Sequence, residues 1–435
     1  MKKRIAVMGA GPMGLALAYF LREWATPVVF EADKQPGGMS ASIDFDGTII
    51  EKYYHFINLP DHSLFSLLHE LDMYDDLRWV PTAMGFYRKG LNGGAKLHDW
   101  GNPVALLKLG DISFRSRFRY GLHVFYCKFI KNLTKLDDVS AADWFRQWEG
   151  DDGYDKFWRF LFEKKFFELA DPLSAAWIAS RIRRVANSRK SLMQEMLGYL
   201  EGGSVSLINR LCEEIRNAGG EIRLGSPANH VDLDPAKEGG IVYSGGEGEY
   251  FDAVASTMPL PYLPSVIPDL PTTYLDAVSE INNIACACAL FRLGKPLTRN
   301  FWLNVDIPEW DIPGIIEYSN LRPMEKTHVY IPFYMPHAHS NWQGSDFSML
   351  DKAREYLRDI NGPAAASEEA ARVFRYEYAQ PVCTPGFRNI LPPYETGARG
   401  ILSADTTHSF PEDRSINESV RIAAELAEHL KNMTV

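Results

Sequence analysis

Apolar positions near the amino terminus follow a strand pattern, then a helix pattern, then a strand pattern again. Residues 4–8 and 28–30 suit short buried strands, and apolar residues recur at helical spacing between residues 15 and 24. A strand, a helix and a second buried strand in this order form a βαβ unit, which requires a parallel sheet with both faces covered. Strand-like runs at 221–224, 252–256 and 400–405, and helical patterns at 205–217 and 416–430, extend this alternation.

The segments between these runs have a different texture. Asp46-Gly47 lies between two short strand-like runs and predicts a β-hairpin. Helical and aromatic patterns dominate the next long segment, and strands mixed with turns dominate a later one. The sequence therefore predicts an α/β fold with two domains. A discontinuous Rossmann-like dinucleotide-binding domain would comprise 1–60, 197–265 and 391–435. An inserted α+β substrate-binding domain would have a helical part at 61–196 and a mixed β-sheet at 266–390.

Composition and charge narrow the class of protein. The chain has 435 residues, of which 46% are hydrophobic, so it can form sizeable cores. Its net charge of −10 argues against a nucleic-acid partner. Five scattered cysteines without a CxxC pair suit the reduced thiols of the cytoplasm. The first residues imitate a signal peptide, but glycines interrupt the apolar run, and no later run has the roughly 18 apolar residues of a membrane span. We expect a cytoplasmic protein without a metal site.

A glycine motif follows the first predicted strand. Gly9, Gly11 and Gly14 form G-x-G-x-x-G, which allows a tight turn, close approach of a pyrophosphate and close packing of helix on strand. The turn opens a helix, whose amino-terminal N–H groups favour negative charge. Glu31, at the end of the second strand, can accept hydrogen bonds from ribose hydroxyls and would repel a 2′-phosphate. The motif predicts a dinucleotide site that does not bind NADP.

Four further stretches resemble the flavin amine oxidase and protoporphyrinogen oxidase-like superfamily, whose members include UDP-galactopyranose mutases. They are Gly37-Gly38 after Glu31, the segment 200–207 with Gly202-Gly203, the strand 252–259, and the strand 400–405 before the last helix. The resemblance implies a GR2-type FAD-binding domain and non-covalent FAD. Covalent attachment through Cys383 is an alternative, although a small buried thiol is expected there. The family resemblance also implies hydride transfer from an organic substrate to flavin N5, with dioxygen or another acceptor reoxidising the flavin.

The resemblance also implies which residues contact FAD. Asp405 would bind the ribityl or pyrophosphate region, unless it only caps a turn, and the last helix would point its amino terminus at the flavin. The complete expected set is Gly9, Gly11, Pro12, Met13, Gly14, Glu31, Ala32, Gly37, Gly38, Met39, Ser40, Ala228, Asp405, Ser415 and Ile416.

Catalytic residues are less clearly indicated. His55 lies in a stretch similar to one that reaches the flavin in this superfamily, although a core histidine bonded to backbone is the alternative. Tyr318 is a second candidate facing the substrate. Many amine oxidases have a lysine on a substrate-domain strand, but this chain has no lysine at the expected position, Ala285. His55 in an aromatic setting and an arginine cluster that includes Arg181 and Arg184 indicate an alternative function, a redox-neutral nucleotide-sugar mutase like UDP-galactopyranose mutase. A non-catalytic flavoprotein is a third possibility.

Two basic segments bear on the partners of the protein. Arg181 and Arg184 belong to a cluster that suits a phosphate-bearing or sugar-bearing small-molecule substrate, with structural ion pairs as the equal alternative. Tyr54 and Tyr334 are further candidates for contact with that substrate. Residues 106–135 interleave basic and aromatic side chains, which suits peripheral contact with a membrane, whereas a solvated helix face is the default interpretation. The sequence indicates no oligomeric state.

Overall fold

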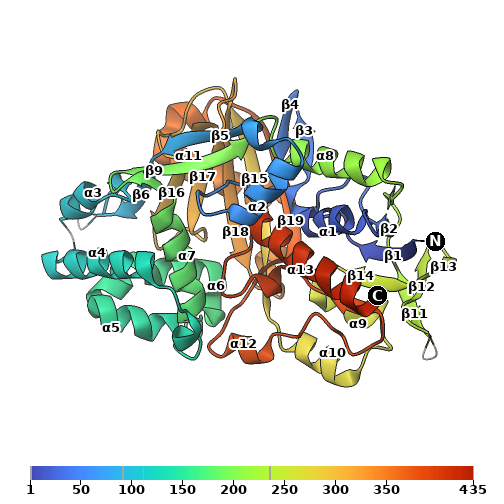
Figure 1. Cartoon of the computed structure of the whole chain (residues 1–435). Coiled ribbons are helices and arrows are strands. Elements are labelled where there is room, and N and C mark those ends of the chain that lie inside the picture. The colour runs from blue at the N-terminus through green and yellow to red at the C-terminus, as the bar shows by residue number, and fades with distance from the viewer. Residues whose placement is uncertain (1, 91–92, 111, 235–236, 435) are drawn as a thin grey trace.

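A five-stranded parallel sheet forms the end of the molecule that carries both termini (Figure 1). The computed structural model describes residues 2–90, 93–110, 112–234 and 237–434. All five predicted strands are present in this sheet. Its order is β10 (Glu221–Arg223), β2 (Ala25–Phe30), β1 (Lys3–Met8), β14 (Ala253–Ser256) and β20 (Ile401–Ser403). Every pairing is parallel, so the carboxyl ends of the strands meet at one edge.

Both faces of this sheet are covered, as its continuous apolar strands require. Ile5 and Val7 of β1 belong to one core cluster, and the alternate residues Ala6 and Met8 belong to another. The first cluster lies under helices and the second under an antiparallel sheet and two short helices. The helices on the first face are α1 (Pro12–Leu21), α2 (His62–Glu70), α8 (Ser204–Asn217) and α13 (Ile416–Thr434). The elements on the second are β11 (His230–Leu233), β12 (Gly240–Ser244), β13 (Glu247–Phe251), α9 (Leu263–Val266) and α10 (Thr272–Ser279).

A seven-stranded mixed sheet forms the centre of the molecule (Figure 1). Its order is β19 (Glu368–Pro381), β15 (Asn283–Leu293), β18 (Thr327–Met335), β17 (Gly314–Glu317), β16 (Trp302–Asp306), β6 (Met84–Lys89) and β7 (Ala95–Trp100). Helix α11 (Asp346–Ala365) packs against β15 and β19. The predicted hairpin at Asp46-Gly47 joins β3 (Ser42–Phe45) to β4 (Thr48–Glu51), with both turn residues at positive φ.

The expectation that residues 61–196 are helical is wrong for part of that segment. Residues 77–82, 84–89 and 95–100 form three strands, because they pair with one another or with strands distant in the sequence. Of these, β5 (Leu77–Thr82) joins β9 (Gln194–Leu200) and β8 (Arg189–Ser191) in a small sheet. The predicted domain boundaries stay a prediction.

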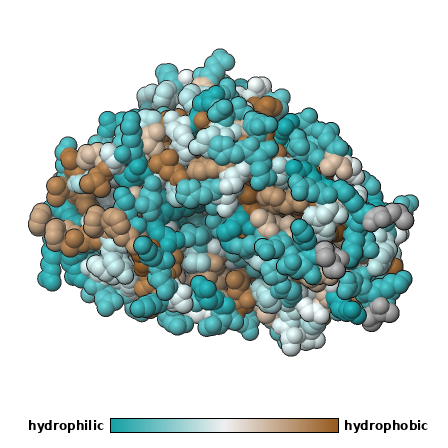
Figure 2. Space-filling model, in the orientation of Figure 1, coloured by the Kyte–Doolittle hydropathy of each residue, from teal (hydrophilic) through white to brown (hydrophobic). Residues whose placement is uncertain are grey.

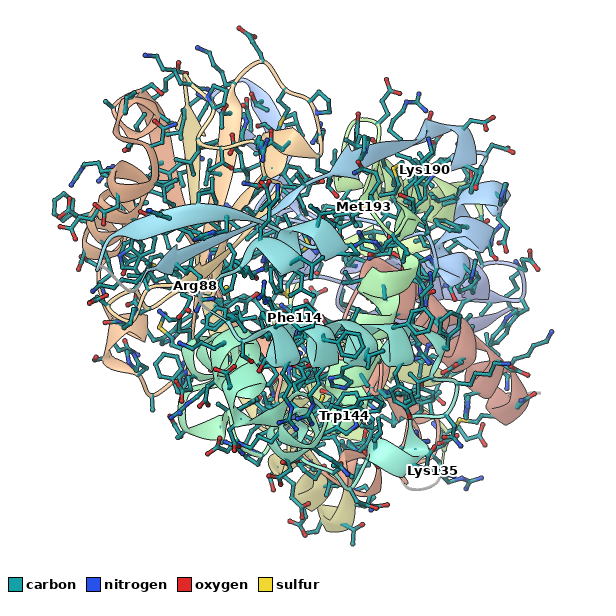
Figure 3. All side chains as sticks on the ribbon, turned by 90° about the vertical axis from the view of Figure 1, so that its left-hand side faces the viewer. Arg88, Phe114, Lys135, Trp144, Lys190 and Met193 are labelled. Carbon is teal, nitrogen blue, oxygen red and sulfur yellow. The ribbon has the colours of Figure 1, made fainter. Side chains whose placement is uncertain are left out.

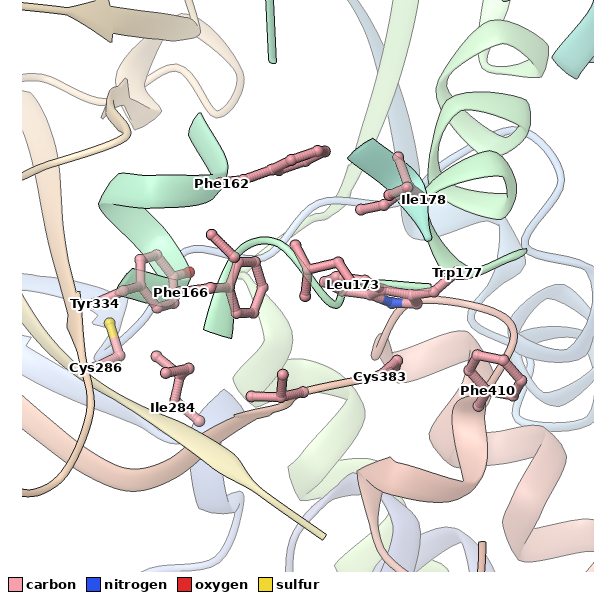
Figure 4. Close-up of a cluster of buried hydrophobic side chains, with 14 of the residues drawn as sticks. Phe162, Phe166, Leu173, Trp177, Ile178, Ile284, Cys286, Tyr334, Cys383 and Phe410 are labelled. Atoms are coloured by element: carbon pink, nitrogen blue, oxygen red, sulfur yellow. The ribbon is translucent and has the colours of Figure 1, made fainter. Parts of the chain in front are cut away.

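A helical layer makes up the opposite end of the molecule (Figure 1). It contains α3 (Pro103–Lys108), α4 (Phe114–Phe129), α5 (Ala141–Tyr154), α6 (Phe160–Phe166) and α7 (Ala175–Asn187). The short helix α12 (Phe387–Ile390) contributes Phe387 to the large apolar core of this end. One large apolar core joins this layer to the central sheet (Figure 4). In this core, Phe166 of α6 faces Tyr334 and Cys286 of the central sheet (Figure 4). Helix α6 therefore lies at the boundary between the helical layer and the sheet.

Candidate functional site

A cavity of 1140 Å³ begins at the carboxyl edge of the parallel sheet and continues between the central sheet and the helical layer. Its walls come from segments far apart in the sequence. They include the β1–α1 turn, the start of α13, the inner face of β15, β18 and β19, and parts of α4, α6 and α7. One continuous space therefore joins the predicted dinucleotide site to the predicted substrate region.

The β1–α1 turn has the conformation that its glycines allow. Gly9 has φ +104°, and its N–H donates to the carbonyl of Phe30 at 2.8 Å. A Cβ at Gly14 would lie 1.9 Å from the carbonyl oxygen of Gly9, so only glycine permits this packing of helix against strand. The Glu31 carboxylate accepts from the N–H groups of Ala10 at 2.7 Å and Asp33 at 2.9 Å, which ties the turn to the end of β2.

Most residues expected to contact FAD do line the cavity. They are Gly9, Gly11, Pro12, Met13, Glu31, Ala32, Gly38, Met39, Ser40, Ala228, Asp405, Ser415 and Ile416. Gly14 and Gly37 do not line the cavity, but each packs closely against neighbouring backbone atoms. Gly37 has φ +121° and donates its N–H to the carbonyl of Ala10 at 2.8 Å, and a side chain there would clash with Ala41. These two glycines shape the turn without reaching the space it encloses.

The carboxyl-terminal segment presents Asp405 and the start of α13 to the same space. Asp405 accepts from the N–H groups of Leu260 at 2.9 Å and Thr407 at 2.8 Å, so it does cap a turn while it lines the cavity. Burial raises the pKa of this carboxyl, but its hydrogen bonds outweigh burial and hold the pKa below the ordinary value. The Ser415 hydroxyl accepts from the N–H of Glu418 at 3.2 Å, and the positive end of the 19-residue helix α13 opens on the cavity.

These features fit an FAD molecule. The first turn of α1 has no side-chain cap on its free N–H groups. Gly38 lies so close to Gly11 that a Cβ at Gly38 would be 3.2 Å from the Gly11 Cα, which leaves the backbone itself as the wall of the cavity. Bare backbone, free N–H groups and a helix terminus are the surfaces that hold a pyrophosphate.

His55 lies at the junction of the two parts of the cavity. Its Nδ1 lies 2.8 Å from the carbonyl oxygen of Tyr53, and its Nε2 lies 3.4 Å from the Ser40 hydroxyl. Burial lowers the pKa of His55, against the raising effect of Glu51, so the ring is neutral at neutral pH. A neutral ring whose Nδ1 donates to a carbonyl carries an acceptor at Nε2.

The placement of Tyr318 corrects its expected role. This side chain is 1% exposed and does not line the cavity, because its hydroxyl turns away to donate to the carbonyl of His55 at 3.1 Å. Tyr318 therefore positions the backbone of His55 and does not face a substrate. Tyr54 and Tyr334 do line the cavity, and their hydroxyl oxygens are 3.5 Å apart.

Ion pairs occupy the arginines expected to bind a phosphate. Arg184 forms two hydrogen bonds to Asp61, at 3.1 and 2.9 Å, and Arg181 contacts Asp413 at 3.2 Å. Both guanidinium groups line the cavity, but each already has a carboxylate partner. Both arginines thus line the cavity as members of ion pairs, and their contact with a substrate stays a prediction.

Lys165 is the residue that sequence reasoning missed. It lies on α6, is 8% exposed and lines the cavity, where its ammonium nitrogen is 3.2 Å from Gln380 and 4.7 Å from the ring centroid of Tyr334. Burial, and next the positive charges of Arg181 and Arg414, lower its pKa well below the ordinary value. Helical spacing from the apolar positions 161 and 162 could have placed it on the inner face of α6.

Strand β15 carries no lysine and presents cysteines to the cavity. Cys286 and Cys288 are the residues of β15 that line the cavity, whereas Ala285 is not among them. Ala285, the position where the sequence comparison expected a lysine, therefore lies on the face of β15 that points away from the cavity. A lysine does reach the same space, but it comes from the helical layer. Arg414, two residues before the start of α13, is a second cationic residue of the cavity wall that the sequence pattern did not single out.

The fold and the cavity are those of a dinucleotide-binding protein, with a dinucleotide turn at the edge of a parallel sheet and a cavity that continues from it along a second, mixed sheet. The family model for flavin containing amine oxidoreductase matches residues 14–412. The chain belongs to the flavin containing amine oxidoreductase family, and it is an FAD-dependent oxidoreductase, as the sequence resemblance indicates.

Relatives agree with this assignment. Protoporphyrinogen oxidase 2 of Arabidopsis thaliana is 31% identical over 142 residues, a match that spans 32% of this chain and 27% of that protein. A candidate protoporphyrinogen oxidase from Exiguobacterium sp. has a similar structure, with a TM-score of 0.77, 18% identity and 99% of each chain covered. Reduced UDP-galactopyranose mutase has a TM-score of 0.74 and 17% identity, with 100% of this chain and 94% of that chain covered. These structural likenesses show the fold.

We predict that alanine substitutions at two glycines of the turn have different effects on stability and on FAD binding. Gly14→Ala places a Cβ against the Gly9 carbonyl, so we expect both lower stability and loss of flavin. Gly11→Ala meets no protein atom within 4 Å, so we expect normal stability. Its methyl group still crowds the cofactor, at a cost of about 1–3 kcal/mol, which lowers FAD affinity about ten- to a hundredfold.

The measurement combines thermal unfolding of the apoprotein with FAD titration followed by flavin fluorescence. An apoprotein with Gly11→Ala that unfolds as easily as one with Gly14→Ala would show that both glycines act only on packing.

We further predict that Asp413 stabilises the fold by neutralising buried cations. Burial raises its pKa, but Arg181, Arg414 and Lys165 outweigh burial and lower the pKa to about 2 from 3.8. A lowered pKa contributes stability above the unfolded value that is lost as pH falls from 3.8 toward about 2. Asp413→Asn should cost about 3 kcal/mol at neutral pH and weaken the pH dependence in that window.

Urea unfolding at several pH values measures both effects. Glu412→Gln is the matched control, because the neighbouring Glu412 is itself more exposed than Asp413 and pairs with Arg183, so its loss should cost about 0.5 kcal/mol. Equal losses in the two variants would contradict a special role of Asp413.

Proposed function

We propose that this protein oxidises an apolar organic substrate that carries an anionic group, using non-covalent FAD and removing a hydride from the substrate. The observation that carries the proposal is the single cavity that joins the dinucleotide turn to a chamber with a buried lysine. Apolar and aromatic side chains form most of the chamber. Its wall includes Phe166, Trp302, Phe301, Phe374 and Tyr376.

FAD would be held by the β1–α1 turn, Glu31, Asp405 and the start of α13, with His55 between the cofactor and the substrate chamber. Bound FAD would supply the oxidising equivalents by taking the hydride, and dioxygen or another acceptor would restore it. Non-covalent binding is supported by Cys383, which does not line the cavity and whose thiol pKa burial raises well above the ordinary value. A protonated thiol is a poor nucleophile.

Lys165 would accept the proton that the substrate loses. Burial, and next the charges of Arg181 and Arg414, lower the pKa of this amine, which favours the neutral form that can accept a proton. The hydroxyl groups of Tyr54 and Tyr334 would hydrogen-bond a polar atom of the substrate beside this amine. The aromatic walls would exclude water and fix the orientation of the substrate.

An anionic group on the substrate is supported by a charge imbalance. Arg181, Arg414 and Lys165 surround one carboxylate, Asp413, so two guanidinium groups and an amine share a single negative charge. A substrate carboxylate would complete this cluster through a charge-assisted pair with Arg414. Protoporphyrinogen, the apolar tetrapyrrole named for the Arabidopsis relative, has this combination of features and is the first substrate to test.

The mutase alternative loses its main support. It depended on arginines free to bind the phosphates of a nucleotide sugar, and Arg184 is instead paired with Asp61. The walls of the chamber are also mostly apolar, which suits a sugar diphosphate poorly.

The proposed function is tested by anaerobic reduction of the purified flavoprotein. Protoporphyrinogen, aromatic amines and UDP-galactopyranose are mixed separately with the oxidised protein, and bleaching of the flavin absorbance is followed by stopped flow. We expect bleaching by a compound that combines apolar bulk with a carboxylate. No bleaching by any of them, together with turnover of UDP-galactopyranose after reduction by dithionite, would replace the oxidase by the mutase.

For Lys165→Met we predict flavin reduction at least about a hundredfold slower, because the variant lacks the proton acceptor. In the parent protein, the rate should fall as pH drops through the pKa of Lys165, since the protonated amine cannot accept a proton. In the variant, this limb of the pH profile should disappear. Lys164→Met is the matched control, because Lys164 lies on the same helix but hydrogen-bonds the carbonyls of Ile307 and Trp310 outside the cavity.

A further inference from the structure

Helix α4 (Phe114–Phe129) presents its apolar stripe to solvent. Phe114, Phe118 and Phe129 are 64%, 58% and 61% exposed, and Leu122 and Phe125 are also exposed. These five positions recur at spacings of three and four residues, which places them on one side of the helix. The opposite side, with buried His123 and Cys127, packs against α5 and α7. A surface helix of a globular protein normally shows the reverse arrangement.

Neighbouring elements extend this apolar surface. Exposed apolar side chains lie on α3, on α7 and in the turn between β8 and β9. They are Val104, Leu107, Val185, Leu192 and Met193. Figure 2 shows hydrophobic side chains gathered over α3 and α4 at one end of the molecule. Figure 3 shows Phe114 and Met193 on the same face. We call this surface the α4 face. An apolar surface of this extent marks a site of interaction.

The α4 face is strongly basic in an acidic protein. Residues 112–136 contain six lysines or arginines and no aspartate or glutamate, although the whole chain has a net charge of −10. Arg115, Lys131 and Lys135 are exposed, and among the described residues no carboxylate forms an ion pair with them. Lys190 lies beside Met193 at the edge of the face (Figure 3). The charge of this surface therefore complements an anionic partner.

The large cavity opens at the α4 face. Its lining includes Leu106, Phe125, Lys128, Val185 and Leu192, several of which are exposed on that face. The cavity therefore reaches from the carboxyl edge of the parallel sheet to an apolar surface at the opposite end of the molecule. A partner on this surface would lie over the mouth of the cavity.

We propose that the α4 face docks on an anionic lipid bilayer, with α4 in the plane of the interface and the cavity mouth against the lipid. An amphipathic helix with phenylalanine and leucine on one side and lysine and arginine at its margins has the composition for this role. The described chain has no helix long and apolar enough to cross a bilayer, so the contact is peripheral. Binding is measured without turnover, so the proposal does not depend on the proposed function.

A flotation experiment measures the binding. The purified flavoprotein is mixed with vesicles of phosphatidylcholine alone or of phosphatidylcholine with phosphatidylglycerol, and the bound fraction is determined at low and high salt. We expect binding to the anionic vesicles, release by salt, and little binding to neutral vesicles. Lys131→Gln and Lys135→Gln should each lower the partition coefficient about fivefold. Phe118→Ser should lower it about tenfold. Phe347→Ser, which removes a 73% exposed phenylalanine from α11, is the matched control and should have no effect.

A labelling experiment maps the contact. All five native cysteines are buried, so a new surface cysteine can be labelled selectively with an environment-sensitive fluorophore. We expect a blue shift on addition of anionic vesicles for labels at Phe118→Cys and Met193→Cys, and none at Phe347→Cys. The proposal is overturned by a protein that stays unbound at low salt, by a shift at all three positions, or by a concentration-dependent dimer in solution that Phe118→Ser abolishes. The last result would assign the α4 face to a second copy of the chain.

Discussion

The common carboxyl edge of the parallel sheet is the constraint on which the rest of the structure depends. Strands that begin as far apart as residues 3 and 401 end at this edge on either side of β14, so the β1–α1 turn and Asp405 line one space. The turn can lie this close only because Gly14 has no side chain to meet the Gly9 carbonyl. The flavin site follows from the sheet, since the segments that would contact FAD have no other reason to meet.

Electrostatics in the chamber follow from the way the second sheet and the helical layer close over this edge. Their contact excludes water from Lys165, and exclusion of water lowers the pKa of an amine. The same exclusion makes cations costly unless a carboxylate lies among them, which accounts for Asp413. A chamber that is mostly apolar and short of one negative charge would suit the apolar, anionic substrate that we propose. The lowered pKa of Lys165 and the proposed preference for an anionic, apolar substrate would thus both follow from the exclusion of water.

The sequence predicted the parallel sheet and most of the residues around the dinucleotide, because both depend on local patterns. Strand and helix periods identified β1, α1 and β2, and the glycine spacing identified the turn between them. The chamber could not be predicted in the same way. Lys165 and Arg414 are ordinary in sequence, and only the packing of α6 against β16 and β18 brings Lys165 to the cavity that Arg414 also lines. The opposite holds for Tyr318, which the sequence predicted to face the substrate. Its hydroxyl instead donates to the backbone carbonyl of His55. Residues 77–100 were misjudged because their pairing partners are distant.

The α4 face and the cavity also belong together physically. Exposing five apolar side chains on one helix opposes folding, so a protein retains such a surface only where something covers it or where function requires it. The cavity mouth lies at this surface, and a mostly apolar passage leads from it to the chamber. An apolar substrate would be scarce in water and concentrated in a bilayer, and a passage that opens into lipid spares it transfer through water. The basic margin then has a simple role, because it orients the mouth toward an anionic surface. On this interpretation the entry route and the chemistry at its far end suit the same kind of molecule.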